Sequence, residues 1–307
     1  MQQDAEQGSV AGVRLTHADK LLYPAMGVTK RQVAEYFAAR AKAMLPHVAR
    51  RPVSLVRCPE GRAQACFFQK HAGSGLPAAV ERVAVAEKSG VKKDYLLFSS
   101  KRALVSCAQV GALELHLWGS RVDRIERPDR LVFDLDPGDG VDFAAIRRAA
   151  FDLRDALREA ELPSWPLLTG GKGIHLVVTL ERRHDWSTIG SFAKDFAEKF
   201  ADLDPQRFVA TMSKAKRKGR IFIDHFRNRR GATAIAPYSP RAREGAPIAA
   251  PVSWQELECI ERANAFSLVD PERRLAARGK AWPSDDKRRA RLTQAGAARI
   301  GLDLAAG

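Results

Sequence analysis

The stretch Leu131-Val-Phe-Asp-Leu-Asp-Pro137 decides how this chain is organised. Its apolar residues predict a buried strand, which the turn residues Pro137-Gly-Asp-Gly140 bring to an end. Alternate residues of a strand share a face, so Asp134 and Asp136 converge. Paired carboxylates repel each other and are costly to desolvate, and a divalent cation such as Mg²⁺ relieves both costs. On this stretch alone, a strand end with solvated acids explains the pattern equally well.

A second apolar strand, Ile221-Phe-Ile-Asp224, also ends in an aspartate. If the two strands are neighbours, Asp134, Asp136 and Asp224 could share two metal ions. Such a pair of metals holds an attacking hydroxyl and a leaving pyrophosphate in line. Taken by itself, Asp224 fits better as a surface acid paired with Arg220 or Arg227.

The glycine-rich segment Thr169-Gly-Gly-Lys-Gly-Ile-His175 lies between these acids in the sequence. Its glycines allow backbone N–H groups to point at an anion, and Lys172 and the Thr169 hydroxyl add donors. His175 could donate to a phosphate oxygen. The Walker A spacing is absent, and the segment joins a strand to a strand. By itself it fits an ordinary hairpin turn, with Lys172 solvated and His175 packed.

The charge balance points to a polyanionic partner. The chain has 307 residues, and 51 Lys and Arg against 36 Asp and Glu give a formal net charge of +15. Cations that neutralise phosphates release condensed counterions, so nucleic acid is the expected partner. No long apolar segment and no signal peptide are present, so we expect no membrane association and a cytoplasmic location. The four cysteines form no C-x-x-C pair, which predicts free buried thiols without a zinc site.

The remaining pattern mixes helices and strands, which predicts the α+β class with mixed or antiparallel sheets flanked by helices. We expect a tail over 1–12 and one domain over 13–300, with parts at 13–120, 121–265 and 266–300. Helices are predicted after the caps Thr29, Asp142 and Ser253, and a core-facing stripe at Phe192, Phe196 and Phe200. Strands are predicted at 52–57, 65–69, 95–98 and 104–107, and a short helix at 108–117.

Taken together, the order of these motifs resembles the archaeo-eukaryotic primase superfamily, and more closely the polymerase domain of bacterial non-homologous end-joining ligase D. Further matches run from about residue 13 to residue 265. They include Arg51-Pro-Val-Ser-Leu-Val-Arg57, Phe67-Phe-Gln-Lys-His71, Glu114-Leu-His-Leu-Trp-Gly119 and Tyr238-Ser-Pro-Arg-Ala-Arg243. Where the family usually has Ser at the start of the glycine-rich loop, this chain has Thr169. Where the family often has Asn near the N-terminus, it has His17.

The resemblance implies a primase-like fold and a set of site residues. Asp134, Asp136 and Asp224 would be the catalytic acids and would bind two divalent cations, Mn²⁺ or Mg²⁺. The residues implied for the incoming NTP or dNTP are His116, Thr169, Lys172, His175, Arg227 and Arg241. A pocket for the 5′-phosphate of a gapped or broken DNA end would use Lys20 and Lys30, with Phe67 or Phe68 stacking on a base. Strand alternation predicts that at least one of these two phenylalanines is buried.

The resemblance also implies the function. The chain is expected to be a two-metal-ion nucleotidyltransferase, a primase-type DNA-dependent polymerase that fills gaps and extends broken DNA ends, with ribonucleotides preferred. Ku and a ligase domain are the implied partners, near the nucleoid. The alternative is a non-catalytic module that binds the 5′-phosphate and bridges ends, and a third possibility is a metal-dependent nuclease. The basic segment 214–220 is expected to contact the DNA backbone or the triphosphate. The resemblance implies that the predicted hairpin with Lys88, Lys92 and Lys93 contacts the partner DNA end when a break is bridged.

Overall fold

The computed structural model describes residues 8–87, 89–269, 282 and 289–304. The chain forms two compact units. The first comprises Met1–Leu117, Ile235–Ala249 and Phe266–Gly279, and the second comprises Trp118–Ala234, Ala250–Ala265 and Lys280–Gly307. Neither unit is a continuous stretch of chain, unlike the continuous parts expected from the sequence. The expected extension over 266–300 lies partly outside the described residues.

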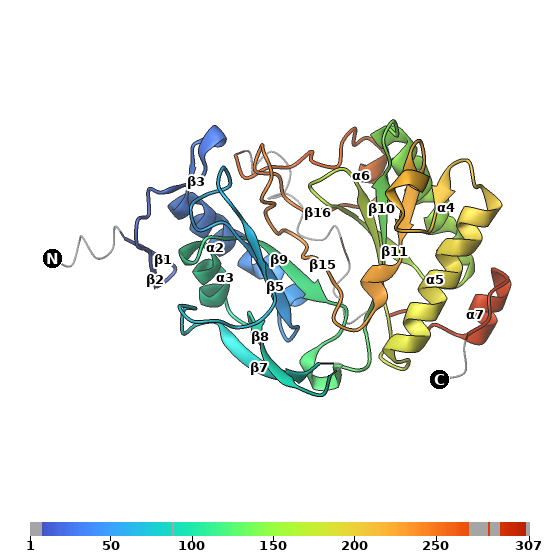
Figure 1. Ribbon diagram of the computed structural model, residues 1–307, viewed down its shortest axis with the longest axis horizontal. Coiled ribbons are helices and arrows are strands. Elements are labelled where there is room, and N and C mark those ends of the chain that lie inside the picture. The colour runs from blue at the N-terminus through green and yellow to red at the C-terminus, as the bar shows by residue number, and fades with distance from the viewer. Residues whose placement is uncertain (1–7, 88, 270–281, 283–288, 305–307) are drawn as a thin grey trace. The chain divides into compact units, whose positions relative to one another are not determined.

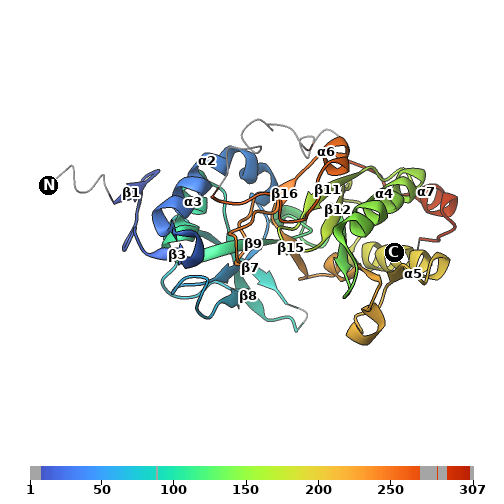
Figure 2. The same ribbon diagram turned by 90° about the horizontal axis from the view of Figure 1, so that it is seen from above.

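The first unit is built on a six-stranded sheet with the order β15-β9-β5-β8-β7, and β6 pairs with β5 off this path. Helix α2 packs along α3 (Figures 1 and 2), and its apolar residues Val33, Phe37 and Met44 are fully buried. Two small hairpins, β1–β2 and β3–β4, complete the described part of the unit. The bounds are β1 Ser9–Val10, β2 Val13–Arg14, β3 Leu21–Tyr23, β4 Val28–Thr29, α2 Lys30–Val48, β5 Val53–Arg57, β6 Phe67–Gln69, β7 Glu81–Ala86, β8 Lys92–Leu97, α3 Lys101–Gln109, β9 Ala112–Trp118 and β15 Thr233–Ile235.

The second unit is built on a six-stranded sheet with the order β13-β14-β10-β12-β11-β16. All its pairs are antiparallel except β13 with β14. Figure 1 shows α4 and α5 together on one side of this sheet. The bounds are β10 Arg130–Pro137, α4 Phe143–Glu159, β11 Ser164–Leu168, β12 Ile174–Thr179, α5 Trp186–Leu203, β13 Phe208–Val209, β14 Ile221–Asp224, β16 Ala250–Pro251, α6 Trp254–Glu258 and α7 Gln294–Arg299.

The helix-covered face of β10 determines where its acids point. Phe133 is fully buried, and its ring lies 4.7 Å from the ring of Phe196 on α5. Because neighbouring residues of a strand alternate between faces, Asp134 and Asp136 point to the face opposite α5. The predicted stripe is confirmed: Phe192 and Phe196 are buried, and Phe200 stacks on Phe196 with 5.2 Å between ring centroids. The aromatic core thus holds β10 through the face that α5 covers, and Asp134 and Asp136 lie on the opposite face.

The predicted α+β class and the three predicted helix caps are confirmed. Thr29 and Ser253 each form a capping box, and the Asp142 carboxylate accepts the N–H of Ala145. The predictions around residue 108 are wrong, because residues 104–107 belong to α3 and 112–117 to β9. Gly111 makes the turn between them in a left-handed conformation, with φ of 66°. In β9, Leu113, Leu115 and Leu117 alternate with Glu114 and His116, and this period of two is the pattern of a strand rather than of a helix.

Two further expectations are wrong. The predicted tail over 1–12 ends too late, because Ser9–Val10 pairs with Val13–Arg14 in a hairpin. The prediction of free thiols fails for Cys58 and Cys66, which form a disulfide between the end of β5 and the start of β6. Cys107 is buried and Cys259 exposed, both as free thiols. Within the described residues, no helix is long and apolar enough to cross a membrane.

Candidate metal and nucleotide site

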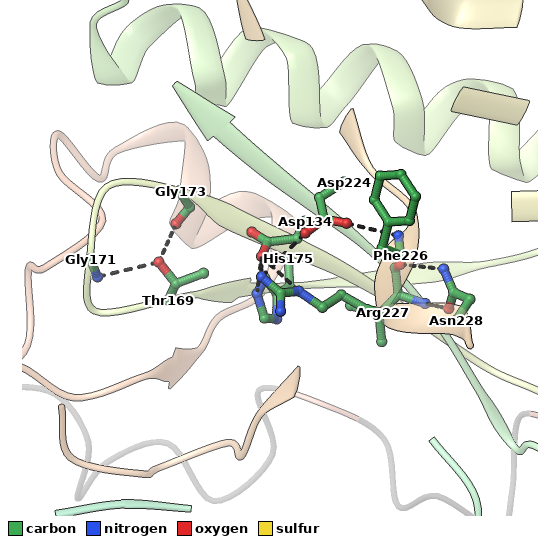
Figure 3. A network of polar contacts seen from close by, with 10 residues as sticks. Asp134, Thr169, Gly171, Gly173, His175, Asp224, Phe226, Arg227 and Asn228 are labelled. Carbon is green, nitrogen blue, oxygen red and sulfur yellow. Dashed lines mark hydrogen bonds and ion pairs between the residues drawn. The ribbon is translucent and has the colours of Figure 1, made fainter. Parts of the chain in front are cut away.

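Three aspartates meet on the face of the second sheet opposite α5 because β10 lies between β14 and β12. In the strand register, Asp134 is paired directly with Asp224 on β14 and with His175 on β12. Directly paired residues of antiparallel strands place their side chains on the same face, about 5 Å apart. Asp136 lies two residues further along β10, on that same face. The convergence of the acids is therefore a consequence of strand order and register, and Figure 3 shows Asp134, Asp224 and His175 side by side.

The acid cluster, by which we mean Asp134, Asp136 and Asp224, has the ligands that a divalent cation requires. One carboxylate oxygen from each residue lies within 4.8 Å of the others. Asp134 Oδ1 is buried, and within the described part of the chain it has no hydrogen-bond partner. A buried carboxylate oxygen without a partner is costly, and a hard cation is the ligand that would satisfy it. The residues present therefore fit a divalent metal site.

Two cationic or donor side chains converge on the other oxygen of Asp134. His175 Nε2 lies 3.2 Å from Asp134 Oδ2, and Arg227 Nη2 lies 3.0 Å from the same oxygen. Arg227 Nη2 is also 3.2 Å from Asp224 Oδ2, so one guanidinium bridges two acids of the cluster (Figure 3). Burial raises the pKa of Asp134, but His175 and Arg227 outweigh this effect and hold the pKa below its usual range. Asp134 is thus the most firmly ionised acid of the cluster.

The other two acids are affected in the opposite direction. Burial and the charge of Asp134 raise the pKa of Asp136 to about 6. Burial also raises the pKa of Asp224, against the influence of Arg227. Three close, buried carboxylates cannot all ionise without cost, which is the condition that bound cations relieve. This electrostatic imbalance is independent of the geometric argument and points to the same kind of ligand.

The glycine-rich segment forms the tight turn between β11 and β12, as predicted. The Thr169 hydroxyl donates to the Gly173 carbonyl at 2.9 Å and accepts the Gly171 N–H at 3.2 Å, which closes the turn (Figure 3). A Cβ on Gly173 would lie 2.3 Å from the Leu135 carbonyl oxygen and 3.2 Å from Asp136 Oδ1. Only glycine therefore allows this turn to approach the acid cluster so closely. Lys172 is exposed on the turn, and His175, the first residue after Ile174 on β12, is buried.

Asn228 is a structural contributor that the sequence did not reveal. β14 ends at Asp224, and beyond this point the Asn228 side chain, instead of a strand, forms hydrogen bonds with the backbone of β10. Its carbonyl accepts the Val132 N–H at 2.7 Å, and its amide donates to the Val132 carbonyl at 2.7 Å and to the His225 carbonyl at 2.9 Å. Asn228 is fully buried and lies one residue after Arg227. An asparagine in a basic segment carries no sequence signal for this role.

Lys20 and Lys30, predicted for a 5′-phosphate, belong to the first unit and lie near each other. The Lys30 N–H donates to the Lys20 carbonyl at 2.8 Å. Lys20 Nζ pairs with Glu60 at 2.7 Å, and Lys30 Nζ donates to the Thr16 carbonyl at 2.7 Å. Burial and the charge of Lys20 lower the pKa of Lys30. A nearby anion would stabilise the charged form of Lys30, which burial and the neighbouring Lys20 disfavour.

Both Phe67 and Phe68 are exposed, so the expectation that one of them is buried is wrong. Their exposed fractions are 48% and 53%. β6 has three residues and pairs only with β5, so neither face of this short strand is covered. The Arg57 guanidinium lies 5.4 Å from the Phe67 ring, and the Phe68 ring makes an edge contact with His116 at 5.7 Å. Both rings remain accessible for stacking on a base.

His116 and Arg241, predicted to contact the nucleotide, also belong to the first unit and share a partner. That partner is the buried Glu114, whose two oxygens lie 2.8 Å from His116 Nε2 and 3.1 Å from Arg241 Nε. Glu114 belongs to the motif Glu114-Leu-His-Leu-Trp-Gly119, but no role was predicted for it. A spacing of two along a strand predicts that Glu114 and His116 share a face, and this was the available signal.

The two basic segments have different settings. Residues Lys214–Arg217 form a 3₁₀ turn, and the Gly219 N–H donates to the Asp139 carbonyl at 2.8 Å. This bond ties the basic segment to the turn that follows β10. Lys92 and Lys93 are exposed at the start of β8, in a β7–β8 hairpin. Lys88 lies outside the described residues.

Known proteins are similar to this chain over most of its length. The sequence profile of the family described as LigD, primase-polymerase domain, matches residues 29–282. The Multifunctional non-homologous end joining protein LigD of *Pseudomonas aeruginosa* is 38% identical over 271 residues, which are 88% of this chain and 32% of that protein. The LigD of *Mycobacterium tuberculosis* strain H37Rv is 38% identical over 254 residues, 80% of this chain and 33% of that protein. The chain therefore spans about a third of the length of these relatives.

A solved structure is also similar. The polymerase domain from *Mycobacterium tuberculosis* ligase D in complex with DNA has a TM-score of 0.80 and 35% identity, covering 87% of this chain and 95% of that one. The match extends over almost all of that domain. On the strength of the profile and this structure, the chain belongs to the LigD primase-polymerase domain family.

Proposed function

We propose that this chain is a metal-dependent nucleotidyltransferase that adds nucleotides to a DNA strand at gaps and broken ends in non-homologous end joining. The observation that carries the proposal is the acid cluster, in which Asp134, Asp136 and Asp224 meet beside a glycine-rich turn. These three acids lie on one face of the sheet, and one of them, Asp134, has a buried oxygen without a hydrogen-bond partner among the described residues. Together they provide ligands for two divalent cations. Family membership supports the same activity.

Each part of the second unit has a distinct task in this proposal. Bound Mn²⁺ or Mg²⁺ would neutralise the triphosphate and lower the cost of forming the alkoxide nucleophile. Asp134 and Asp136 would hold both metals, and Asp224 would help to hold the metal on the primer side. Thr169, Lys172 and His175 bind the triphosphate, through backbone N–H groups of the turn and through the side chains of Lys172 and His175. Arg227, which lies on Asp134 and Asp224, adds positive charge beside the nucleotide.

The first unit supplies recognition of the DNA end and of the nucleotide. Lys20 and Lys30 bind the 5′-phosphate, and Phe67 and Phe68 stack on bases, which suits any sequence. His116 and Arg241 contact the incoming nucleotide. The related structure contains DNA, and the relatives are named for non-homologous end joining, which supports gapped or broken duplexes as the substrate. Ribonucleotides as preferred substrates, Ku and a ligase domain as partners, and a cytoplasmic site of action complete the proposal.

The burial of the acids favours this enzyme over an end-bridging module without catalysis. Asp134 is buried and Asp136 has a raised pKa, so the cluster is costly to keep. DNA binding alone gains nothing from carboxylates, which repel phosphate. A nuclease would share the acids but has no triphosphate to bind, and so has no use for the turn beside them.

Primer extension tests the proposal. A labelled primer on a gapped duplex with a 5′-phosphate is incubated with the chain, Mn²⁺ and either rNTPs or dNTPs. We expect the primer to lengthen, and to lengthen faster with rNTPs. Tight binding without extension would support the bridging module instead, and a shortened primer would support a nuclease.

A further inference from the structure

Glu114 contacts two of the residues predicted to contact the nucleotide, His116 and Arg241. It lies on β9, and its side chain is 7% exposed. Glu114 Oε2 accepts from His116 Nε2 at 2.8 Å. Glu114 Oε1 pairs with Arg241 Nε at 3.1 Å and accepts the Ala242 N–H at 2.8 Å. One carboxylate therefore connects β9 to the segment that carries Arg241.

The contact with Glu114 fixes the ring of His116 in two respects. Because the carboxylate accepts from Nε2, the neutral imidazole carries its proton on Nε2 and its lone pair on Nδ1. The Phe68 ring meets the imidazole edge-on, with 5.7 Å between centroids and 70° between planes. His116 is thus held on one side by a charge and on another by an aromatic ring, which limits both its rotation and its tautomer.

Arg241 is held at its backbone as well as at its side chain. The Tyr23 hydroxyl donates to the Arg241 carbonyl at 2.8 Å, and the Arg241 N–H donates to the Pro247 carbonyl at 2.8 Å. These two bonds fix the Cα position, and Glu114 fixes the guanidinium, whose side chain is 13% exposed. Glu114 is thus a buried group that directs the Arg241 side chain.

The charge of Glu114 is maintained by these partners. Burial raises its pKa, but the hydrogen bond from His116 and the charge of Arg241 outweigh burial and bring the pKa to about 2. Glu114 is therefore ionised in the folded state and attracts two residues that are predicted to contact the nucleotide. This distinguishes Glu114 from Glu87 in the same unit, which accepts from Lys70, His71 and Tyr95 but touches no residue predicted to contact the nucleotide.

We propose that Glu114 is a positioning residue for the incoming nucleotide, because it holds the His116 imidazole and the Arg241 guanidinium in one fixed arrangement before the nucleotide binds. The inference rests on the proposed function, in which both side chains contact that nucleotide. Side chains that are ordered in advance lose less conformational entropy on binding. Removing the charge of Glu114 should therefore raise the nucleotide KM more than it lowers kcat.

The test compares Glu114→Gln with Glu87→Gln in the full chain. A glutamine at 114 keeps the shape, but its single carbonyl oxygen cannot serve His116, Arg241 and the Ala242 N–H together. We expect the Kd for a fluorescent ribonucleotide with Mn²⁺, and the KM, to rise about tenfold, which is the effect of losing one hydrogen bond to a charged group. The kcat at saturating nucleotide should change less than threefold, and Glu87→Gln should leave the nucleotide Kd unchanged.

Two further measurements separate positioning from a purely structural role. The imidazole ¹⁵N spectrum of His116 should report Nε2–H in the unmodified chain and a mixture of tautomers in Glu114→Gln. The effects of Glu114→Gln and His116→Ala on nucleotide Kd should be non-additive, since both remove the same interaction. If Glu114→Gln does not fold, the same comparison is made with Glu114→Asp, which keeps the charge but shortens its reach.

A nucleotide Kd within twofold of the unmodified value in a folded Glu114 variant would overturn the inference. Equal rises in Glu114→Gln and Glu87→Gln would do so too, because the effect would then be general destabilisation. If the unmodified chain binds nucleotide but extends no primer, the proposed function fails while the Kd comparison still decides the inference. If it binds no nucleotide, both fail.

Discussion

The acid cluster and the end-binding surface, by which we mean Lys20, Lys30, Phe67 and Phe68, have different supports. The acid cluster lies on three adjacent strands, where register alone places Asp134 beside Asp224. The end-binding surface lies on a three-residue strand, a hairpin end and the start of a helix, where Lys20 is held by one exposed ion pair. Central strands therefore determine the position of chemical groups strictly, whereas the end-binding surface has fewer constraints and more room to adapt to DNA.

The largest effect is expected where the register of the acid cluster is held by a side chain. Asn228→Ala leaves the buried N–H and carbonyl of Val132 without partners, which costs about 3–5 kcal/mol in the free energy of unfolding. Denaturant unfolding would measure the loss, and metal-dependent activity should fall with it. The exposed Asn264→Ala serves as control. A loss below about 1 kcal/mol would mean that the strands alone hold the register.

Acid should weaken the first unit through Glu114. Its pKa falls from 4.5 to about 2 on folding, so it stabilises the folded state above pH 4.5. This contribution, about 3 kcal/mol, is lost as the pH falls from about 5 through 2. Denaturant unfolding as a function of pH should therefore show a steeper decline for the unmodified chain than for Glu114→Gln. Parallel curves would show that Glu114 titrates alike in both states.

The disulfide should stabilise the end-binding surface rather than the acid cluster. Cys58 and Cys66 close a short loop whose Glu60 pairs with Lys20. Cys66→Ser should reduce the free energy of unfolding by about 2–3 kcal/mol, the chain-entropy value for a loop of this length. Thermal unfolding under non-reducing conditions would measure it, with Cys259→Ser as control. No difference between the two serine variants would count against a supporting role.

The smallest effect is expected for a single phosphate contact. Lys20→Ala should weaken binding to a 5′-phosphorylated gap by about 1 kcal/mol and lower the salt dependence by roughly one counterion. Fluorescence anisotropy with phosphorylated and unphosphorylated duplexes would measure both. Lys42→Ala, which removes an exposed lysine of α2, is the control. If the unmodified chain binds the two duplexes equally, the phosphate pocket is assigned wrongly.

The features predicted correctly from the sequence are those that residues close together in the chain determine. The alternation around Asp134 and Asp136 and the caps at Thr29, Asp142 and Ser253 were predicted because each depends on residues a few positions apart. The adjacency of Asp224 was only a condition, since strand order is not written in local sequence. Membership of the LigD primase-polymerase domain family, first suggested by the order of motifs, is confirmed.

The failures share a cause, which is dependence on contacts that form only when distant parts of the chain fold together. Phe67 and Phe68 alternate in a strand, but the strand has no second layer, so neither is buried. The pairing of Cys58 with Cys66 depends on β6 returning beside β5, and spacing alone does not reveal this. Asn228 and Glu114 act through partners distant in sequence. Such roles become visible only when the strands are assembled.

The most direct test of the central claim is primer extension with Asp136→Ala, compared with Asp139→Ala, which removes an exposed acid three residues further along the chain. Both variants are assayed with Mn²⁺ on the 5′-phosphorylated gapped duplex, and DNA binding is measured alongside. We expect Asp136→Ala to extend at least about a thousandfold more slowly with unchanged end binding, since metal stabilisation of the transition state is worth several kcal/mol. Asp139→Ala should behave as the unmodified chain does. Undiminished extension by Asp136→Ala would contradict the account.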